Sequence, residues 1–132
     1  MSSMLDTNIC IAIMKGNPRA RTKLSQLSPD MVCISSIVLA ELSYGVQKGL
    51  HQEQNKQALA DFLTICPVLD WPGEAAEAYG QIRANLESQG RTIGANDLLI
   101  AAHAVHWNTV LVTHNINEFS KVPGLIIEDW LT

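Results

Sequence analysis

The sequence predicts an α/β protein with three layers, in which a short, mostly parallel sheet of four to five strands lies between helices. Short apolar runs rich in Val, Ile and Leu, typical of strands covered on both faces, alternate along the chain with longer helical patterns. This alternation implies right-handed crossovers and helices on both faces of the sheet. The 132 residues contain no repeat, linker or low-complexity stretch, so we expect one domain over residues 1–132.

The first elements are short. A strand ends at Asp6, and Thr7 or Asn8 caps a helix that continues through the apolar run 9–14. In order, the next signals predict a helix from Pro18 to about Leu27, a strand over 31–34, a helix from about Ser36 to near Gly49, a helix over 52–63 and a strand over 67–70.

The second half of the chain contains the most apolar helix. Asn96 is predicted to cap a helix from Asp97 to about His106, which has almost no polar face and should therefore be buried. The other predicted elements are a helix from about Gly73 to Gln89 that ends at Gly90, a strand over 109–113, a turn or short helix over 114–119 and a last strand over 125–127.

The composition is that of an ordinary globular protein, with 47% hydrophobic and 17% charged residues. No apolar stretch approaches the roughly 20 residues that cross a bilayer, and the N-terminal sequence lacks a secretory pattern, so we expect no membrane association. Cys10, Cys33 and Cys66 each lie in an apolar segment. We therefore expect buried free thiols in a reducing cytoplasm, and we expect neither disulfides nor a zinc site.

The net charge of −4 argues against a protein that holds nucleic acid by bulk electrostatics. A polyanionic substrate would need bound divalent cations or a basic partner to neutralise it. Arg83 and Arg91 flank the segment that leads to Asp97, and they are the residues we expect to contact the phosphates of such a substrate.

Three acidic residues lie where a core-facing charge would be costly. Asp6 ends the first strand, Glu41 is the only charged residue between Asp30 and Lys48, and Asp97 is the only acid on its apolar helix. Taken alone, Asp6 is better explained as a helix cap, and Asp97 as favourable helix electrostatics. Neither explanation applies to Glu41, so the sequence favours a shared acidic site.

Such a site needs a cation, because gathered carboxylates repel one another and raise their own pKa values. Oxygen ligands select Mg²⁺ or Mn²⁺, and a bound cation attracts phosphates to a negatively charged protein. After the strand over 109–113, Asn115 is placed to orient a water molecule, and Glu118 to lie at the margin of the site. His103, His106 and His114 lack a third spaced ligand, and we expect core or surface histidines.

Four segments resemble the PIN-domain ribonucleases, and among them the VapC-type toxins of bacterial type II toxin–antitoxin pairs. They are MLDTN at Met4–Asn8, SSIVLAELSYG at Ser35–Gly45, IGANDLLIAAHA at Ile93–Ala104 and LVTHNINEF at Leu111–Phe119. The closing PGLIIEDW at Pro123–Trp130 is also similar, so the resemblance covers essentially the whole chain.

The resemblance implies a Mg²⁺-dependent endoribonuclease that cuts structured RNA, often a tRNA anticodon loop, and so inhibits translation. It also implies a homodimer inhibited by a cognate VapB-type antitoxin. Carried over by position, Asp6 and Asp97 bind the metal, Glu41 completes the triad, and Asn115 forms the fourth corner with Glu118 beside it. Many PIN domains have an aspartate where Asn115 stands, which predicts one tightly held Mg²⁺.

Two other readings remain open at the level of sequence. A haloacid-dehalogenase-like phosphatase also has an Asp after its first strand, but it needs a second Asp two residues later, where this chain has Asn8. A non-catalytic PIN-like module would bind RNA or protein without cutting. The complete set of Asp6, Glu41 and Asp97 argues against that module. An RNA cleavage assay with and without EDTA discriminates a metal-dependent nuclease from a module that does not cut.

Overall fold

The centre of the protein is a sheet of five parallel strands. A computed structural model describes residues 1–132, and its strands are β1 Ser3–Leu5, β2 Val32–Ser35, β3 Val68–Leu69, β4 Val110–Val112 and β5 Ile126–Glu128. Their spatial order is β3-β2-β1-β4-β5, and every neighbouring pair is parallel. The predicted sheet is confirmed, with β2 and β5 each one residue later than expected.

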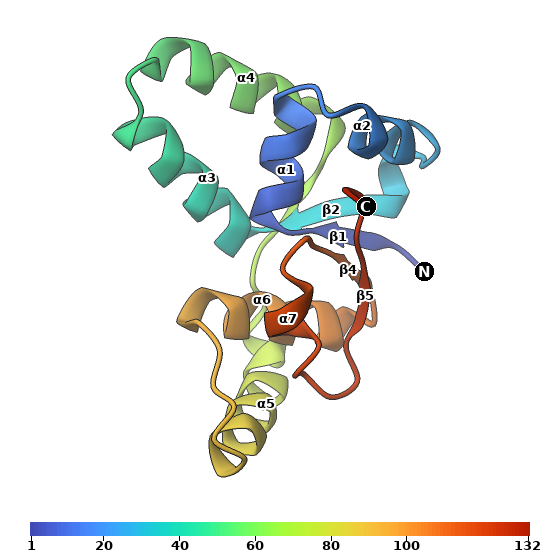
Figure 1. Ribbon diagram of the computed structural model, residues 1–132, viewed down its shortest axis with the longest axis vertical. Coiled ribbons are helices and arrows are strands. Elements are labelled where there is room, and N and C mark those ends of the chain that lie inside the picture. Colours follow the sequence, from blue (N-terminus) through green and yellow to red (C-terminus); the bar gives the residue numbers. More distant parts are fainter.

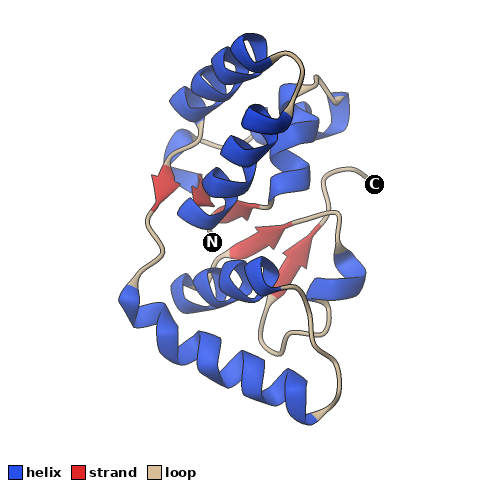
Figure 2. Cartoon of the chain, turned by 90° about the vertical axis from the view of Figure 1, so that its left-hand side faces the viewer, coloured by secondary structure: helices blue, strands red, loops and turns tan.

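Helices cover both faces of this sheet (Figures 1 and 2). On one face lie α1 Thr7–Met14, α2 Pro18–Ser25, α3 Ser36–Lys48 and α4 Gln52–Ile65. On the other lie α5 Ala76–Ser88, α6 Ala95–Trp107 and the short α7 Ile116–Phe119. Two single turns of 3-10 helix, Pro29–Met31 and Gly73–Ala75, precede β2 and α5. No helix is both long enough and apolar enough to span a bilayer.

The strand order reverses at β1. The chain passes from β1 outward to β2 and β3 and then returns to place β4 on the opposite side of β1. The Asp6 N–H donates to the Val112 carbonyl at 2.8 Å, so the ends of β1 and β4 lie side by side. In open parallel sheets such a reversal of strand order is where ligands bind, outside the carboxyl ends of the strands.

The core holds these strand ends in place. Met4 and Leu5 of β1 are completely buried, as are Ile100 and Ala101 of α6. The prediction of a buried helix over 97–106 is therefore confirmed. The three cysteines are free thiols and buried, as predicted.

Two predicted helix caps were wrong. Asp6 itself caps α1, because its Oδ1 accepts the Thr7 N–H at 2.9 Å, and Thr7 and Asn8 lie inside the first turn. The extended backbone of Gly94 precedes α6, so Asn96 lies within the helix and its amide is free to reach Glu41. Thr7 and Asn96 are therefore not occupied as helix caps, and the side chains of both contact Glu41.

Candidate active site

Asp6 lies at the carboxyl end of β1, with only 5% of its surface exposed. Its Oδ1 accepts the Thr7 N–H, and its Oδ2 accepts the Thr113 hydroxyl at 2.7 Å and the Asn8 amide at 3.4 Å. Burial raises the pKa of Asp6, the hydrogen bonds from Thr113 and Thr7 lower it, and the charge of Glu41 raises it again. The carboxylate of Asp6 therefore caps α1 and is also one of the acids of the candidate site.

Glu41 reaches the same place from the second turn of α3. Its Oε1 accepts the Thr7 hydroxyl at 2.6 Å, and its Oε2 accepts the Asn96 amide at 3.4 Å. Thr7 follows Asp6 in the chain, and Asn96 precedes Asp97. The two hydrogen bonds therefore link Glu41 to the immediate neighbours of both other acids.

Asp97 lies in the first turn of α6 and is half-buried. Its pKa is raised to about 6, first by burial and then by the negative charges of Asp6, Glu41 and Glu118. A carboxyl group feels such charges only at short range. Asp6, Glu41 and Glu118 are therefore close enough to Asp97 to form one electrostatic site with it, and the four acids come from the end of β1, α3, α6 and α7.

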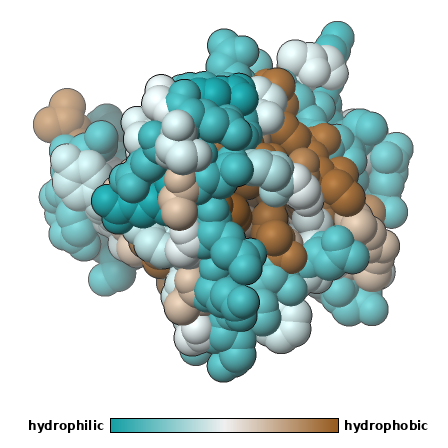
Figure 3. Space-filling model, turned by 90° about the horizontal axis from the view of Figure 1, so that it is seen from below, coloured by the Kyte–Doolittle hydropathy of each residue, from teal (hydrophilic) through white to brown (hydrophobic).

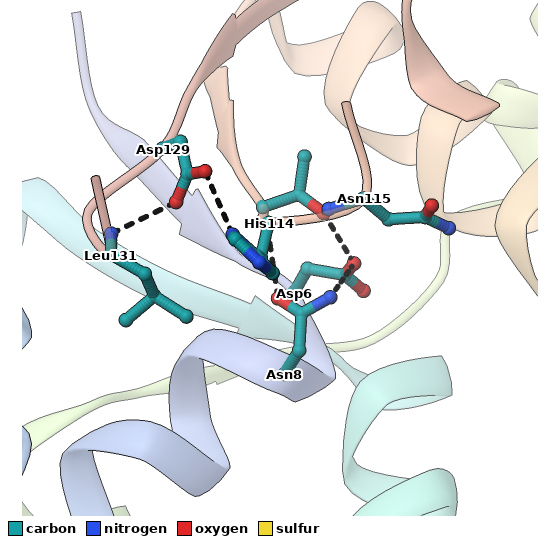
Figure 4. A network of polar contacts seen from close by, with 7 residues as sticks. Asp6, Asn8, His114, Asn115, Asp129 and Leu131 are labelled. Atoms are coloured by element: carbon teal, nitrogen blue, oxygen red, sulfur yellow. Dashed lines mark hydrogen bonds and ion pairs between the residues drawn. The ribbon is translucent and has the colours of Figure 1, made fainter. Parts of the chain in front are cut away.

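Asn115 and Glu118, the remaining candidate site residues, follow β4 in the chain. The Asn115 backbone N–H donates to the Thr113 hydroxyl at 3.0 Å, and that hydroxyl donates to Asp6, so two hydrogen bonds connect Asn115 to Asp6. Glu118 lies in α7 and pairs with Lys121 at 3.3 Å. Figure 4 shows Asn115 and Asp6 in the same polar network.

The sequence reasoning missed a second part of this network (Figure 4). The His114 N–H donates to the Asn8 side-chain oxygen at 3.1 Å, and the His114 ring nitrogen Nδ1 lies 2.9 Å from Asp129. Asp129 also accepts the Leu131 N–H at 2.8 Å. A chain of contacts therefore joins the C-terminal segment to Asp6. No sequence signal for Asp129 existed, because the contact depends on β5 lying beside β4.

Among the other histidines, only His103 belongs to the core. His103 is completely buried, its Nδ1 lies 2.8 Å from the Ser35 hydroxyl, and burial lowers its pKa. No three His, Cys, Asp or Glu side chains are arranged to coordinate a metal ion together.

The carboxylates nevertheless suit a hard divalent cation. Mg²⁺ is usually held by one or two carboxylates and keeps several water molecules, so a three-residue cage is not required. Asp6 and Asp97 supply two such carboxylates in a partly desolvated site. Their raised pKa values show that each disfavours its own charge there, and a cation would relieve this penalty.

The predicted RNA-contacting arginines lie on the α5 side of the molecule. Arg83 is exposed and already donates to Glu87 at 3.1 Å and to the Tyr79 hydroxyl at 3.0 Å. It lines a pocket of about 240 Å³ that also includes Ala95 at the start of α6. Arg91 is exposed, and its guanidinium makes no hydrogen bond or ion pair.

Comparison with known proteins decides the family. The model of the PIN domain family matches residues 3–125. Ribonuclease VapC2 of Rickettsia felis is 45% identical over 132 residues, which cover 98% of both chains. This chain belongs to the VapC ribonucleases of the PIN-domain family. Among other VapC proteins, the tRNA(fMet)-specific endonuclease VapC of Salmonella typhimurium is 43% identical, with 96% of each chain covered.

Solved VapC structures have the same fold. The R. felis VapBC2 structure, bound to a DNA fragment from its promoter, matches with a TM-score of 0.94 and covers 98% of this chain and 99% of that chain. The predictions of a PIN fold, of a VapC family member and of a ribonuclease toxin are therefore confirmed. The phosphatase alternative is wrong, because the matched relatives are ribonucleases over their full length.

Proposed function

We propose that this VapC ribonuclease is a Mg²⁺-dependent endonuclease that hydrolyses one phosphodiester bond in an unpaired loop of a tRNA. The convergence of Asp6, Glu41 and Asp97 on one partly desolvated site carries this proposal. A tRNA-specific relative at 43% identity supports the substrate class. An unpaired loop is favoured because A-form RNA hides its base edges from side chains.

Each residue has a proposed role. Asp6 and Asp97 would hold Mg²⁺, with Mn²⁺ as a substitute, either directly or through water. When bound, the metal lowers the pKa of a coordinated water and shields charge on the phosphoryl oxygens. Glu41 orients the attacking water, since Thr7 and Asn96 fix both of its carboxylate oxygens.

Asn115 and Glu118 complete the site on its β4 side. Asn115 offers an amide to a water molecule or a phosphate oxygen, and Glu118 adds negative charge beside Asp97. The RNA 2′-hydroxyl takes no part in this reaction. The products are therefore a 5′-phosphate and a 3′-hydroxyl.

The test is cleavage of a tRNA(fMet) transcript with Mg²⁺, with and without EDTA, followed by analysis of the new RNA ends. We expect cleavage that EDTA abolishes and that Asp97→Asn removes. Cleavage that persists in EDTA, or products with 2′,3′-cyclic phosphates, would contradict the proposal. A folded protein that binds the transcript without cutting it would instead support the non-catalytic module.

We also propose a cognate VapB-type antitoxin as the partner, acting in the reducing cytoplasm that the free cysteines suit. Solved relatives from R. felis and S. typhimurium are VapBC complexes bound to DNA. An apolar cleft of about 600 Å³ between α1, α2 and α4, lined by Ile13, Leu24 and Phe62, is large enough to receive apolar side chains of such a partner. Co-purification with the product of an adjacent gene tests this proposal.

A homodimer is the proposed state of the toxin itself. Seen from the α5 side, the surface is mostly hydrophilic but shows apolar side chains in a hollow (Figure 3). Such a face suits contact with a second copy. Sedimentation of the purified protein distinguishes one copy from two, and a monomer at all concentrations would contradict the proposal.

Arg83 and Arg91 remain proposed contacts for RNA phosphates. Arg91 is free to bind, whereas Arg83 must exchange its contacts with Glu87 and Tyr79 for an RNA phosphate. Arg91→Ala should therefore weaken RNA binding more than Arg83→Ala. Equal Kd values for the two variants and the wild type would exclude both residues.

A further inference from the structure

One face of α3 continues outward from the proposed active site. Glu41, Tyr44 and Lys48 follow one another at spacings of three and four residues, which places them along one side of the helix. Tyr44 is 65% exposed, an unusual position for a large aromatic side chain. The Lys48 ammonium group lies 4.9 Å from the centre of the Tyr44 ring. An aromatic ring and a cation therefore stand next to the catalytic carboxylate.

A pocket of about 330 Å³ opens beside this face, between α1, α3 and α4. Its apolar walls come from all three helices and include Ile11, Leu42 and Leu59. Glu41 lines the same pocket, so the pocket and the proposed active site share a residue. A ligand bound in this pocket would therefore lie close to Glu41, the residue that we propose to orient the attacking water.

Two lysines from different helices converge on this pocket. Lys15 follows the last residue of α1, Lys48 is the last residue of α3, and both line the pocket. Neither is paired with an acid, since the ion pairs of this protein are Arg83 with Glu87, His114 with Asp129 and Lys121 with Glu118. Both ammonium groups are exposed and available to an anion. The two lysines outnumber the one acid of the pocket, Glu41, so the pocket is locally positive in a chain with a net charge of −4.

We propose that this pocket, which we call the α3 pocket, binds an unpaired nucleotide of the RNA substrate next to the bond that is cut. The apolar walls take the base, and Lys15 and Lys48 contact the flanking phosphates. Tyr44 stacks on the neighbouring base, because every base has a face that an aromatic ring can cover. This inference rests on the proposed nuclease function and adds a substrate site to it.

The experiment measures RNA binding without cleavage. The Asp97→Asn protein is used as the background because Asp97 does not line the α3 pocket. The probe is a fluorescein-labelled RNA hairpin with the loop of the tRNA(fMet) anticodon arm, titrated at several salt concentrations. Lys15→Ala and Lys48→Ala are compared with Lys56→Ala, an exposed lysine of α4 that lies outside the pocket.

Each pocket lysine variant should raise Kd by about three- to tenfold and reduce the slope of log K against log salt concentration by about one. Lys56→Ala should leave both quantities within about twofold of the background protein. Tyr44→Ala should weaken binding by roughly fivefold or more, and Tyr44→Phe should restore it, because stacking does not need the hydroxyl. Thermal unfolding of each variant verifies that these surface changes leave the fold intact.

A probe with an abasic site at one loop position after another tests the base contact. One position should weaken binding to the background protein but have no further effect in Leu42→Ala, which widens the pocket. Unchanged Kd values in all the lysine and tyrosine variants would overturn the proposal, as would variants that weaken binding only to the co-purifying antitoxin. Wild-type protein that fails to cut RNA is a failure of the nuclease function, and the binding data distinguish the two failures.

Discussion

Thr113 and Asp6 are 107 positions apart in the chain, yet the Thr113 hydroxyl donates a 2.7 Å hydrogen bond to Asp6 Oδ2. This bond is buried, and it lowers a pKa that burial of Asp6 otherwise raises. Thr113→Val removes the donor and keeps the shape of the side chain. We expect cleavage to fall by about tenfold or more, because a hydrogen bond to a charged group contributes about 1.5–3 kcal/mol. Single-turnover cleavage of tRNA measures the loss.

Thr113→Ser keeps the hydroxyl and should recover most of the activity. The matched control is Thr109→Val, another buried threonine near β4, whose hydroxyl contacts only the Ala104 carbonyl, at 3.4 Å. It should lower stability without a comparable effect on cleavage. Equal losses in the Thr109 and Thr113 variants would mean that Thr113 acts through the fold alone.

Thr7 is a second positioning residue, because its hydroxyl lies 2.6 Å from Glu41 Oε1. Thr7→Val releases that oxygen and leaves Glu41 held only by the longer Asn96 contact at 3.4 Å. We expect kcat to fall by about tenfold with little change in KM, since RNA binding does not need the orientation of Glu41. Steady-state kinetics over a range of tRNA concentrations separate the two constants.

Thr7→Ser supplies the matched control for that variant. It retains the hydroxyl that donates to Glu41 and the backbone N–H that donates to Asp6. It should return kcat to within about threefold of the wild type. An effect of Thr7→Val confined to KM would show that Thr7 contacts the RNA instead of orienting Glu41.

Asp97→Asn should make the metal-free protein more stable while abolishing cleavage. The folded pKa of Asp97 is about 6, against an ordinary value of 3.8, so its charge opposes folding at neutral pH. Because Asp97 is only half-buried, solvent screening limits the gain to about 1–2 kcal/mol. Urea unfolding in EDTA at about pH 7.5 measures the difference between Asp97→Asn and the wild type.

The same variant has a defined pH dependence. The folded wild type binds a proton at Asp97 more tightly than the unfolded chain, so the penalty is complete above pH 6 and disappears as the pH falls toward 3.8. The stability advantage of Asp97→Asn should therefore shrink steadily below about pH 6. An advantage that stays constant from pH 4.5 to pH 7.5 would mean that the charge of Asp97 is not its source.

The sequence was sufficient to predict the strands, the helices and the acids, because each has a local signal. Apolar runs predicted β2 and β4, and the isolated charges of Glu41 and Asp97 stood out in apolar helices. The common location of these acids followed from the rule that parallel strands present their carboxyl ends at one edge. Resemblance to PIN domains supplied the chemistry that we propose for this edge.

The residues that hold the acids could not be predicted. Thr7 and Asn96 were interpreted as helix caps, which is what their types most often do before an apolar run. Only the packing of α3 against α1 and α6 shows that they donate to Glu41 instead. A contact between segments distant in the chain leaves no pattern in a single sequence. The contact of Asp129 with His114 could not be predicted for the same reason.

Asp129 is the last positioning residue that the geometry identifies, and its replacement tests the link between the C-terminal segment and the site. Its carboxylate joins the His114 ring at 2.9 Å to the Leu131 N–H at 2.8 Å, and the His114 backbone in turn holds Asn8, which donates to Asp6. Asp129→Ala should release the final residues and lower cleavage by about two- to fivefold, because Asp6 keeps its stronger bond from Thr113.

Digestion with carboxypeptidase measures the release of the C-terminal segment, and single-turnover cleavage measures the effect on Asp6. The matched control is Asp30→Ala, because Asp30 is exposed and contacts only Ser28 in the turn before β2. Faster digestion of Asp129→Ala with unchanged cleavage would show that the segment is held by Asp129 but does not position Asp6. Loss of cleavage in both variants would mean that neither acid acts on the site specifically, since Asp30 has no contact that leads to it.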